Sequence, residues 1–238
     1  MKKPLFFLIF CVLLVTIVTV SAISVSKSSC RPEPVFQAEG TDMSVFFTFN
    51  VLWGESQLEA LLQLLDEYEI KAVFFISGQW LKKYPQTAKK IVDRGHWIGN
   101  HTYTHSKLPF MGEEAVAGEI NRFNSLCRET LFAKPVFFRP PYGEYNAKIV
   151  RIASENSCYT LLWSINALTL SNLEMELVIS HIEERIHAGA VILFHSTTPA
   201  VLETLPPIIE FLRWKGYTIA SPDLILEYAE KKFPLPGR

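Results

Sequence analysis

The sequence has few cysteines and no block of basic residues. Four cysteines occur among the 238 residues, and Cys11 lies within an apolar stretch. The other three, Cys30, Cys127 and Cys158, are too scattered to form a disulfide framework or a Cys-x-x-Cys metal pair. The net charge is −1, and no run of lysine or arginine stands out after the first residues. Because phosphate binding needs clustered cations, this composition argues against nucleic acid as a partner.

The chain is also poor in charge relative to its apolar content, which argues against a disordered protein. Charged residues make up 20% of the chain and hydrophobic residues 49%, a balance typical of a globular domain. Without its N-terminal apolar stretch the chain keeps about 210 residues, enough for one sizeable domain. We expect this domain at residues 43–238, after a polar linker at residues 24–42.

A long apolar segment opens the chain. Lys2 and Lys3 precede an almost uninterrupted apolar run from Leu5 to about Ile23. About 20 such residues span a bilayer, whereas Val20-Ser21-Ala22 offers small residues where a signal peptide is cleaved. Residues 1–23 are therefore predicted to be either a signal peptide or a retained membrane anchor. In both cases the domain lies outside the cytoplasm, membrane-anchored or secreted.

Short apolar runs alternate with longer amphipathic segments over the rest of the chain. Runs rich in Val, Ile and Phe predict strands, and a 3.6-residue periodicity predicts helices. The predicted strands are Ser44–Phe49, Lys71–Ile76, Trp97–Gly99, Val136–Phe138, Tyr159–Ile165, Ala190–Phe194 and Tyr217–Ala220. The predicted helices are Ser56–Tyr68, Gln86–Arg94, Glu113–Leu131, Ala147–Asn156, Glu174–His187, Ala200–Lys215 and Asp223–Lys231. About seven strand–helix units in a row predict an α/β fold with a parallel sheet, either open or closed into a barrel.

Histidines stand at two of the predicted strand ends, where the reactive groups of parallel sheets gather. His101 and His105 follow the third strand, and a spacing of four places two imidazoles on one side of a turn, able to share one metal ion. The alternative is a pair of unrelated surface histidines. His195 ends an apolar strand, where it is either a functional residue or a hydrogen-bonded core histidine.

Arg139 and several aromatic residues occupy the same predicted edge of the sheet. The two prolines after Arg139 stiffen the turn and would hold its guanidinium in one place, unless the residue forms an ordinary surface ion pair. Aromatic residues at this edge are either a floor on which sugar rings stack or part of the core and rim. They are Trp53, Tyr103, Tyr142 and Trp163.

Taken in order, these segments resemble the polysaccharide deacetylase family, also known as the NodB homology domain or carbohydrate esterase family 4. The motifs are Thr-Phe-Asn-Val at 48–51, His-Thr-Tyr-Thr-His at 101–105, Arg-Pro-Pro-Tyr-Gly at 139–143, Trp-Ser-Ile-Asn at 163–166 and Leu-Phe-His at 193–195. The first of them is similar to that of the sporulation-associated branch. The resemblance implies a distorted (β/α) barrel of about seven parallel strands, with N-acetylated polysaccharides such as peptidoglycan as substrates.

The resemblance also implies roles for individual residues. In enzymes of the family, a His-x-x-x-His pair and an Asp hold a divalent metal, such as zinc or cobalt, which polarises the acetamide. A second Asp acts as the base, a later His protonates the leaving amine, and an Arg orients the base. The matching residues are His101 and His105 for the metal, Arg139 for orientation and His195 for the general acid. Tyr142, Trp163 and Trp53 are the candidates for stacking against the substrate.

The first motif departs from the family at both acidic positions. Asn50 stands where the base belongs, and Val51 stands where the metal carboxylate belongs. The fourth motif also departs, with Asn166 in place of an Asp and Thr169-Leu170 in place of an Asp-Trp pair. An amide can hold a water by hydrogen bonds but cannot deprotonate it, and losing the base costs about 10²–10⁴-fold in rate. Two imidazoles alone make a weak metal site.

Three functions remain open on the sequence. The first is a metal-dependent deacetylase that hydrolyses acetamide C–N bonds, helped by a substitute carboxylate from Glu55, Asp42 or Glu144. Glu55 also suits a helix start, where the helix dipole favours an acid. The second is a catalytically impaired protein that binds the glycan without cleaving it. The third is a purely structural protein of the cell envelope.

Overall fold

The computed structural model describes residues 32–167, 175–196 and 200–235. The N-terminal apolar segment and Thr169-Leu170 lie outside these ranges. No helix in the described ranges is long and apolar enough to cross a bilayer. Residues 32–235 belong to one compact unit.

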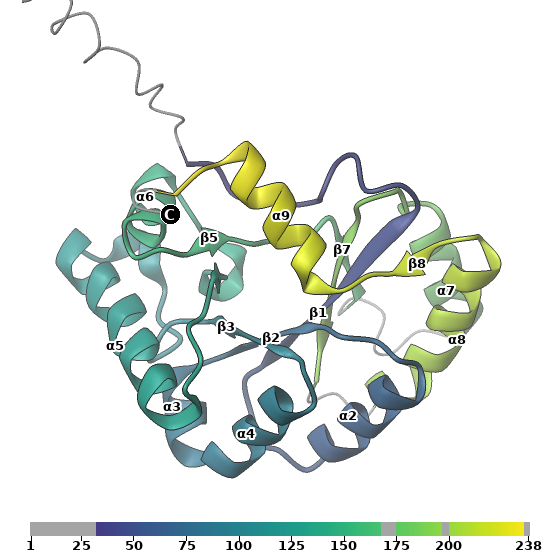
Figure 1. Ribbon diagram of the computed structural model, residues 1–238, viewed down its shortest axis with the longest axis horizontal. Helices are drawn as coiled ribbons and strands as arrows, with labels where there is room; N and C mark the ends of the chain where they lie inside the picture. Colours follow the sequence, from purple (N-terminus) through teal and green to yellow (C-terminus); the bar gives the residue numbers. More distant parts are fainter. Residues whose placement is uncertain (1–31, 168–174, 197–199, 236–238) are drawn as a thin grey trace, which may run out of the picture. The chain divides into compact units, whose positions relative to one another are not determined.

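Within these ranges, eight strands form a curled, parallel sheet (Figure 1). Seven of them pair in the order β5-β4-β3-β2-β1-β7-β6, and β8 pairs with the start of β1. The predicted distorted barrel of about seven parallel strands is therefore confirmed. The strands are β1 (Ser44–Val51), β2 (Val73–Ile76), β3 (Trp97–Asn100), β4 (Phe137–Phe138), β5 (Tyr159–Thr160), β6 (Ile165–Asn166), β7 (Val191–His195) and β8 (Thr218–Ile219).

Helices follow most strands and cover the outside of the sheet, except the last helix, α9, which packs against its inner face (Figure 1). The α-helices are α2 (Leu58–Glu67), α3 (Gly78–Lys83), α4 (Pro85–Asp93), α5 (Glu113–Leu131), α6 (Ala147–Glu155), α7 (Met175–Glu183), α8 (Ala200–Trp214) and α9 (Pro222–Lys232), with short 3-10 turns η1 (Leu108–Phe110) and η2 (Pro141–Gly143). Leucines of α2 form one apolar stripe that packs against the outer face of β1 in a single cluster. Helix α3 was not predicted, since six residues are too short to show a periodicity.

The segment predicted as one strand at Tyr159–Ile165 is in fact two strands at opposite edges of the sheet. Its first two residues pair with β4, and its last residue pairs with β7 as part of β6. Residues 161–164 therefore cross from one edge of the sheet to the other and bring the two edges face to face. We call residues 161–164 the joint. An apolar run does not reveal such a crossing, because both halves are equally buried.

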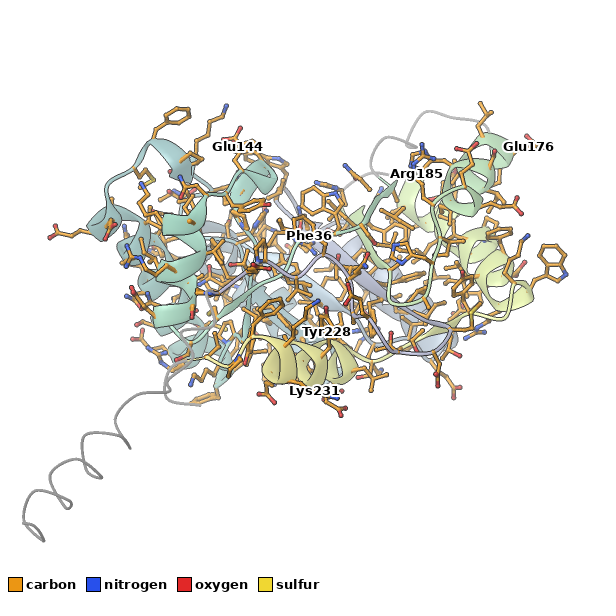
Figure 2. The ribbon with its side chains drawn as sticks, turned by 90° about the horizontal axis from the view of Figure 1, so that it is seen from above. Phe36, Glu144, Glu176, Arg185, Tyr228 and Lys231 are labelled. Carbon is orange, nitrogen blue, oxygen red and sulfur yellow. The ribbon has the colours of Figure 1, made fainter. Side chains whose placement is uncertain are left out.

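The chain just before β1 crosses the joint. We call residues 35–38 the strap. Val35 forms a bridge with Leu161 of the joint, and Gln37 forms a bridge with Ala190 at the start of β7. The strap falls within the segment expected to be a linker, and its backbone is hydrogen-bonded at both ends. Phe36 of the strap and Tyr228 of α9 line one cavity (Figure 2).

Candidate functional site

Strand β1 carries the first motif and directs its side chains toward two different layers. Neighbouring side chains on a strand point to opposite faces. Phe49 and Val51 join the cluster of α2 leucines outside the sheet, and Val51 is only 1% exposed. Thr48 and Asn50 face the other way, where both contact Arg139. Val51 is therefore a core residue, which explains why a hydrophobic side chain is tolerated at this position.

Arg139, directly after β4, is fully buried inside the barrel. Its Nε and Nη2 donate to the carbonyl oxygens of Leu161 and Leu162 in the joint, at 3.0 and 2.9 Å. Nη2 also donates to Thr48 Oγ1 at 3.0 Å, and the guanidinium lies 3.9 Å above the Phe75 ring. All its polar partners are uncharged, and burial lowers the pKa of Arg139 well below its usual value. Arg139 thus fastens the joint to β1.

The orientation of the Asn50 amide follows from Arg139. Nη1 of Arg139 donates to Asn50 Oδ1 at 3.1 Å. Because a guanidinium can only donate, the amide oxygen faces Arg139 and the NH₂ group faces away. Asn50 lies in register with His195 on one neighbouring strand and Phe75 on the other. The position where the family places a base is therefore occupied by a hydrogen-bond donor.

His101 is buried and held in one tautomer. Its Nδ1 donates to the backbone carbonyl oxygen of Arg139 at 2.7 Å. Nε2 consequently carries the lone pair, and it has no hydrogen-bond partner within the described structure. Burial lowers the pKa of His101 well below its usual value, so the ring is neutral. This is the protonation state that a metal ligand requires.

His105 lies close to His101 because the loop between them turns back. The two ring centroids are 4.9 Å apart, and His105 also meets the Tyr142 ring edge-on at 4.9 Å. The loop is held by Glu119 of α5, whose Oε2 accepts hydrogen bonds from the backbone N–H groups of Tyr103 and Thr104, at 3.0 and 2.7 Å. The predicted pair is therefore brought together, and burial lowers the pKa of His105.

His195 ends β7 beside Asn50, as expected from its position in the sequence. Burial, followed by the nearby charge of Arg139, lowers the pKa of His195 to about 4. The imidazole is therefore neutral at pH 7 and can donate or accept one hydrogen bond at each nitrogen, according to its tautomer. Asn166 of β6 lies in register with Leu193, two residues before His195.

The residues present do not fit a three-ligand metal site. His101 Nε2 and the adjacent His105 ring suit a divalent metal, but the third position holds the buried Val51. No group of three or more His, Cys, Asp or Glu side chains that could hold a metal occurs in the described ranges. Structural and catalytic zinc sites use at least three protein ligands. The donor set is thus one ligand short.

The carboxylates considered as substitutes are not grouped with the histidines. Glu55 bonds to the Thr87 hydroxyl of α4 and is exposed. Glu144 lies 3.9 Å from Lys107 in an exposed ion pair. Asp42 is exposed in the turn before β1. Glu55 shares a small cavity with Val51 and Ser196, yet its carboxylate is engaged outside the site.

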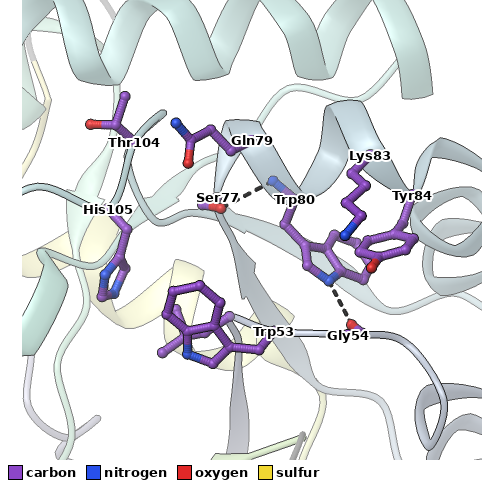
Figure 3. A pocket seen from close by; sticks show the side chains of 10 residues that line it. Trp53, Gly54, Ser77, Gln79, Trp80, Lys83, Tyr84, Thr104 and His105 are labelled. Carbon is purple, nitrogen blue, oxygen red and sulfur yellow. Dashed lines mark hydrogen bonds between the residues drawn. The ribbon is translucent and has the colours of Figure 1, made fainter.

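The aromatic residues predicted to bind substrate surround the site in different ways. Trp163 is half-buried, with the Arg139 guanidinium 5.4 Å from its ring. Tyr142 adopts a positive φ of 62° and is 59% exposed above His105. Trp53 is 74% exposed and lines a pocket of about 200 Å³ next to His105 (Figure 3). These three side chains therefore form a partly exposed aromatic rim.

Comparison with known proteins identifies this arrangement. The family pattern for polysaccharide deacetylase matches residues 37–160, about half of the chain. The chain belongs to the polysaccharide deacetylase family. It is 32% identical over 198 residues to "Uncharacterized protein YlxY" of Bacillus subtilis (strain 168), covering 83% of this chain and 62% of that protein. It is 29% identical over 177 residues to a peptidoglycan-N-acetylglucosamine deacetylase of Bacillus cereus, covering 72% and 64%.

A solved structure of the family shares the same fold. It is a carbohydrate esterase family 4 pseudoenzyme from Bacillus anthracis, with a TM-score of 0.77 and 28% identity over 82% of this chain and 69% of that one. A mutant of that protein has restored enzymatic activity and fits equally well. This chain spans just over three-fifths of the length of the two curated relatives named above.

Sequence reasoning missed two supports of this site. Glu119 lies between Val116 and Phe123 on the buried face of α5. A carboxylate at the core positions of a helix was the available signal for a structural role. The second support is α3, which contributes Trp80 and Lys83 to the pocket in Figure 3.

Proposed function

We propose that this polysaccharide deacetylase homologue binds N-acetylated cell-wall glycans outside the cytoplasm and lacks the hydrolysis that is usual in its family. One observation carries the proposal: Arg139 donates to the amide oxygen of Asn50 at 3.1 Å. This hydrogen bond makes the side chain at the base position a donor, which cannot remove a proton from water. Val51 lies in the core and supplies no ligand to the histidine pair.

The same residues suit the binding of an acetamide group. The NH₂ group of Asn50 is a donor for the acetamide carbonyl oxygen, and the neutral His195 beside it supplies a second polar contact. The exposed rings of Tyr142 and Trp53 offer apolar faces to sugar rings. Binding thus needs only hydrogen bonds and stacking, and neither requires a base.

The relatives support this class of ligand. The relative from Bacillus cereus is a peptidoglycan-N-acetylglucosamine deacetylase, and the structural neighbour from Bacillus anthracis is a pseudoenzyme of the same family. Lys2, Lys3 and the apolar run that follows agree with export to the envelope, where peptidoglycan is found.

A second candidate is weak metal-dependent deacetylation. The observation that favours it is the lone pair of His101 Nε2, which lies next to His105 without a partner in the described structure. Zinc or cobalt bound there by two imidazoles would polarise an acetamide carbonyl. The chain would still lack a base at position 50.

Binding and acetate release separate the two candidates. We would titrate the full chain with an N-acetylglucosamine tetramer by calorimetry and measure acetate release with micromolar zinc or cobalt. The expected result is binding without acetate release. Acetate release that disappears in His101→Ala would instead establish the second candidate. Absence of binding to any N-acetylated glycan would contradict the proposed function.

Restoring carboxylates at positions 50 and 51 tests whether the site lacks only the groups needed for hydrolysis. The double variant Asn50→Asp with Val51→Asp is expected to release acetate in a metal-dependent way, because a carboxylate on the last residue of β1 is unfavourable in the apolar cluster and turns toward the histidine pair. Asn50→Asp alone restores the base without the third ligand and stays at least about 10²-fold slower. Because Val51 is a core residue, circular dichroism must show that the double variant folds. A folded double variant that binds the tetramer and zinc yet releases no acetate would show that the site has changed beyond these two positions.

A further inference from the structure

A pocket of about 200 Å³ lies next to His105, between β1 and α3 (Figure 3). Ligand pockets for drug-sized molecules are typically about 300–1,000 Å³, so this one suits a single sugar ring and not several. His105 forms part of its wall, which places the pocket beside the Asn50 and His101 site. A glycan that reaches the site with one sugar can therefore place a neighbouring sugar in the pocket.

Two tryptophans give the pocket its shape. Trp80 is 3% exposed, and its indole N–H donates to the carbonyl oxygen of Gly54 at 2.8 Å, which fixes the ring as a rigid wall. Its backbone N–H is capped by the Ser77 hydroxyl at 3.2 Å. Trp53 stands across from it with 74% of its surface exposed (Figure 3). A rigid wall and an open aromatic face together favour stacking on a flat ligand ring.

The pocket also carries a positive charge that no lining residue balances. Lys83 lines the pocket, with Nζ 5.0 Å from the centre of the Tyr84 ring. The remaining lining residues are uncharged, since burial lowers the pKa of His105 and keeps its ring neutral at pH 7, and none is acidic. Glu55 acts on Lys83 only as a weak, distant charge, because its carboxylate bonds to Thr87 and lines a neighbouring cavity. A hydrogen bond to Tyr84 raises the pKa of Lys83, so the side chain is protonated at neutral pH.

We propose that this pocket holds a sugar ring that bears a carboxylate, next to the N-acetylated sugar at Asn50. The inference rests on the proposed function and adds the chemical class of the second sugar. Lys83 pairs with the carboxylate, Trp53 and Trp80 enclose the ring, and Gln79 and Thr104 offer hydrogen bonds to its hydroxyl groups. The carboxylate belongs either to a lactyl ether, as in N-acetylmuramic acid, or to a uronic acid.

Four tetrasaccharides test the charge preference by calorimetry on the full chain. They are a neutral N-acetylglucosamine tetramer, a peptide-free alternating N-acetylglucosamine–N-acetylmuramic acid tetramer, its methyl ester, and an alternating N-acetylglucosamine–glucuronic acid tetramer. At least one acidic tetramer is expected to bind about three- to tenfold more tightly than the neutral tetramer and, for the muramic acid form, than the ester. The acid that shows the advantage identifies the source of the carboxylate.

Two neighbouring lysines provide a matched pair of variants. Lys83→Gln is expected to abolish the preference for the acid, while Lys82→Gln, an exposed neighbour on α3 that does not line the pocket, keeps it. Raising the salt concentration should reduce the preference in the wild type, because dissolved ions screen the attraction between Lys83 and the sugar carboxylate. Equal affinity for acid, ester and neutral tetramers would overturn the inference and leave the proposed function standing. If no tetramer binds, both the inference and the proposed function are contradicted.

Discussion

A buried guanidinium that has no carboxylate partner among the described residues is the most unusual single feature of this structure. Arg139 is fully buried and satisfies its donors with two backbone carbonyls, one hydroxyl and one amide. In an active family member, a carboxylate at position 50 would balance the positive charge of this arginine. Here the arginine is retained although that acid is absent. Its remaining role is to join β1, β4 and the joint, which gives it structural importance independent of catalysis.

Replacing Arg139 by lysine is therefore expected to destabilise the fold. An ammonium group cannot reach Asn50, Thr48 and both joint carbonyls at once, so several buried groups lose their partner. We expect a loss of about 3–5 kcal/mol in the free energy of unfolding, measured by urea denaturation. The control is Arg151→Lys, whose ion pairs with Glu113 and Glu155 are exposed and whose stability should barely change. Similar losses in both variants would contradict the structural role.

His96 makes stability depend on pH. Its Nδ1 accepts the backbone N–H of Ala72 at 3.3 Å, and burial lowers its pKa to about 4. In the unfolded chain a histidine titrates near 6.5, so between pH 6.5 and 4 the unfolded state binds more protons. Stability is therefore fully present above pH 6.5 and falls by up to about 3 kcal/mol as the pH drops to 4. Denaturation curves at pH 7.5, 6 and 5 measure this slope.

The variant His96→Gln separates His96 from the other buried imidazoles. A glutamine amide oxygen can still accept from Ala72 but does not titrate in this range. His195, whose pKa is also lowered to about 4, keeps its contribution in the variant. We expect a shallower but nonzero slope between pH 6.5 and 4. An unchanged slope would mean that His96 is not protonated on unfolding in this window.

At the scale of elements, the loop after β3 depends on a helix that is distant in the sequence. Asn100 Oδ1 accepts the N–H of Thr102 at 2.8 Å, and Glu119 of α5 accepts the next two N–H groups. Thr102 and His105 both have positive φ, at 65° and 60°. Non-glycine residues adopt such angles at a cost and need external support. Glu119 supplies this support and so positions His105.

Removing that support should loosen the histidine loop. Glu119→Ala leaves two backbone N–H groups without a partner, and we expect a loss of about 1–3 kcal/mol in stability. Hydrogen exchange at the amides of Tyr103 and Thr104 should accelerate, and affinity for the N-acetylglucosamine tetramer should fall. Glu119→Gln keeps one acceptor and is expected to lie between the wild type and the alanine variant. Equal exchange rates in all three proteins would exclude this role of Glu119.

The elements also show how much the sequence could reveal. Helix α5 was predicted with its observed ends, because its 19 residues carry several turns of periodicity. The joint was missed because local pattern does not report which strand a residue pairs with. The strand-end motifs at Asn50, His101 and Arg139 were placed together correctly, since parallel strands align their carboxyl ends. The direction of the Asn50 amide could not be predicted, because it depends on a side-chain contact from another strand.

At the scale of the whole molecule, the barrel is completed by the strap over the joint. Val35 donates to the carbonyl oxygen of Thr160 and accepts from Leu162, both at 2.8 Å. At the other end, Ala38 donates to the carbonyl oxygen of Gly189 at 2.9 Å. The strap thus links β5 to the start of β7, two strands on different sides of the sheet order. It should therefore contribute to global stability as well as to local order.

Gly189 is the position at which this closure can be tested. It has a φ of +83°, and an added Cβ would lie 2.1 Å from the backbone oxygen of Ala38. Gly216 has nearly the same φ, +84°, with nothing within 4 Å of such a Cβ. Both alanine variants carry the backbone strain of about 1–2 kcal/mol, and only Gly189→Ala also displaces the strap.

We expect Gly189→Ala to lower the unfolding free energy further than Gly216→Ala and to accelerate hydrogen exchange at Val35 and Ala38. Equal losses in the two variants would show that the strap lies on the barrel without helping to hold it closed.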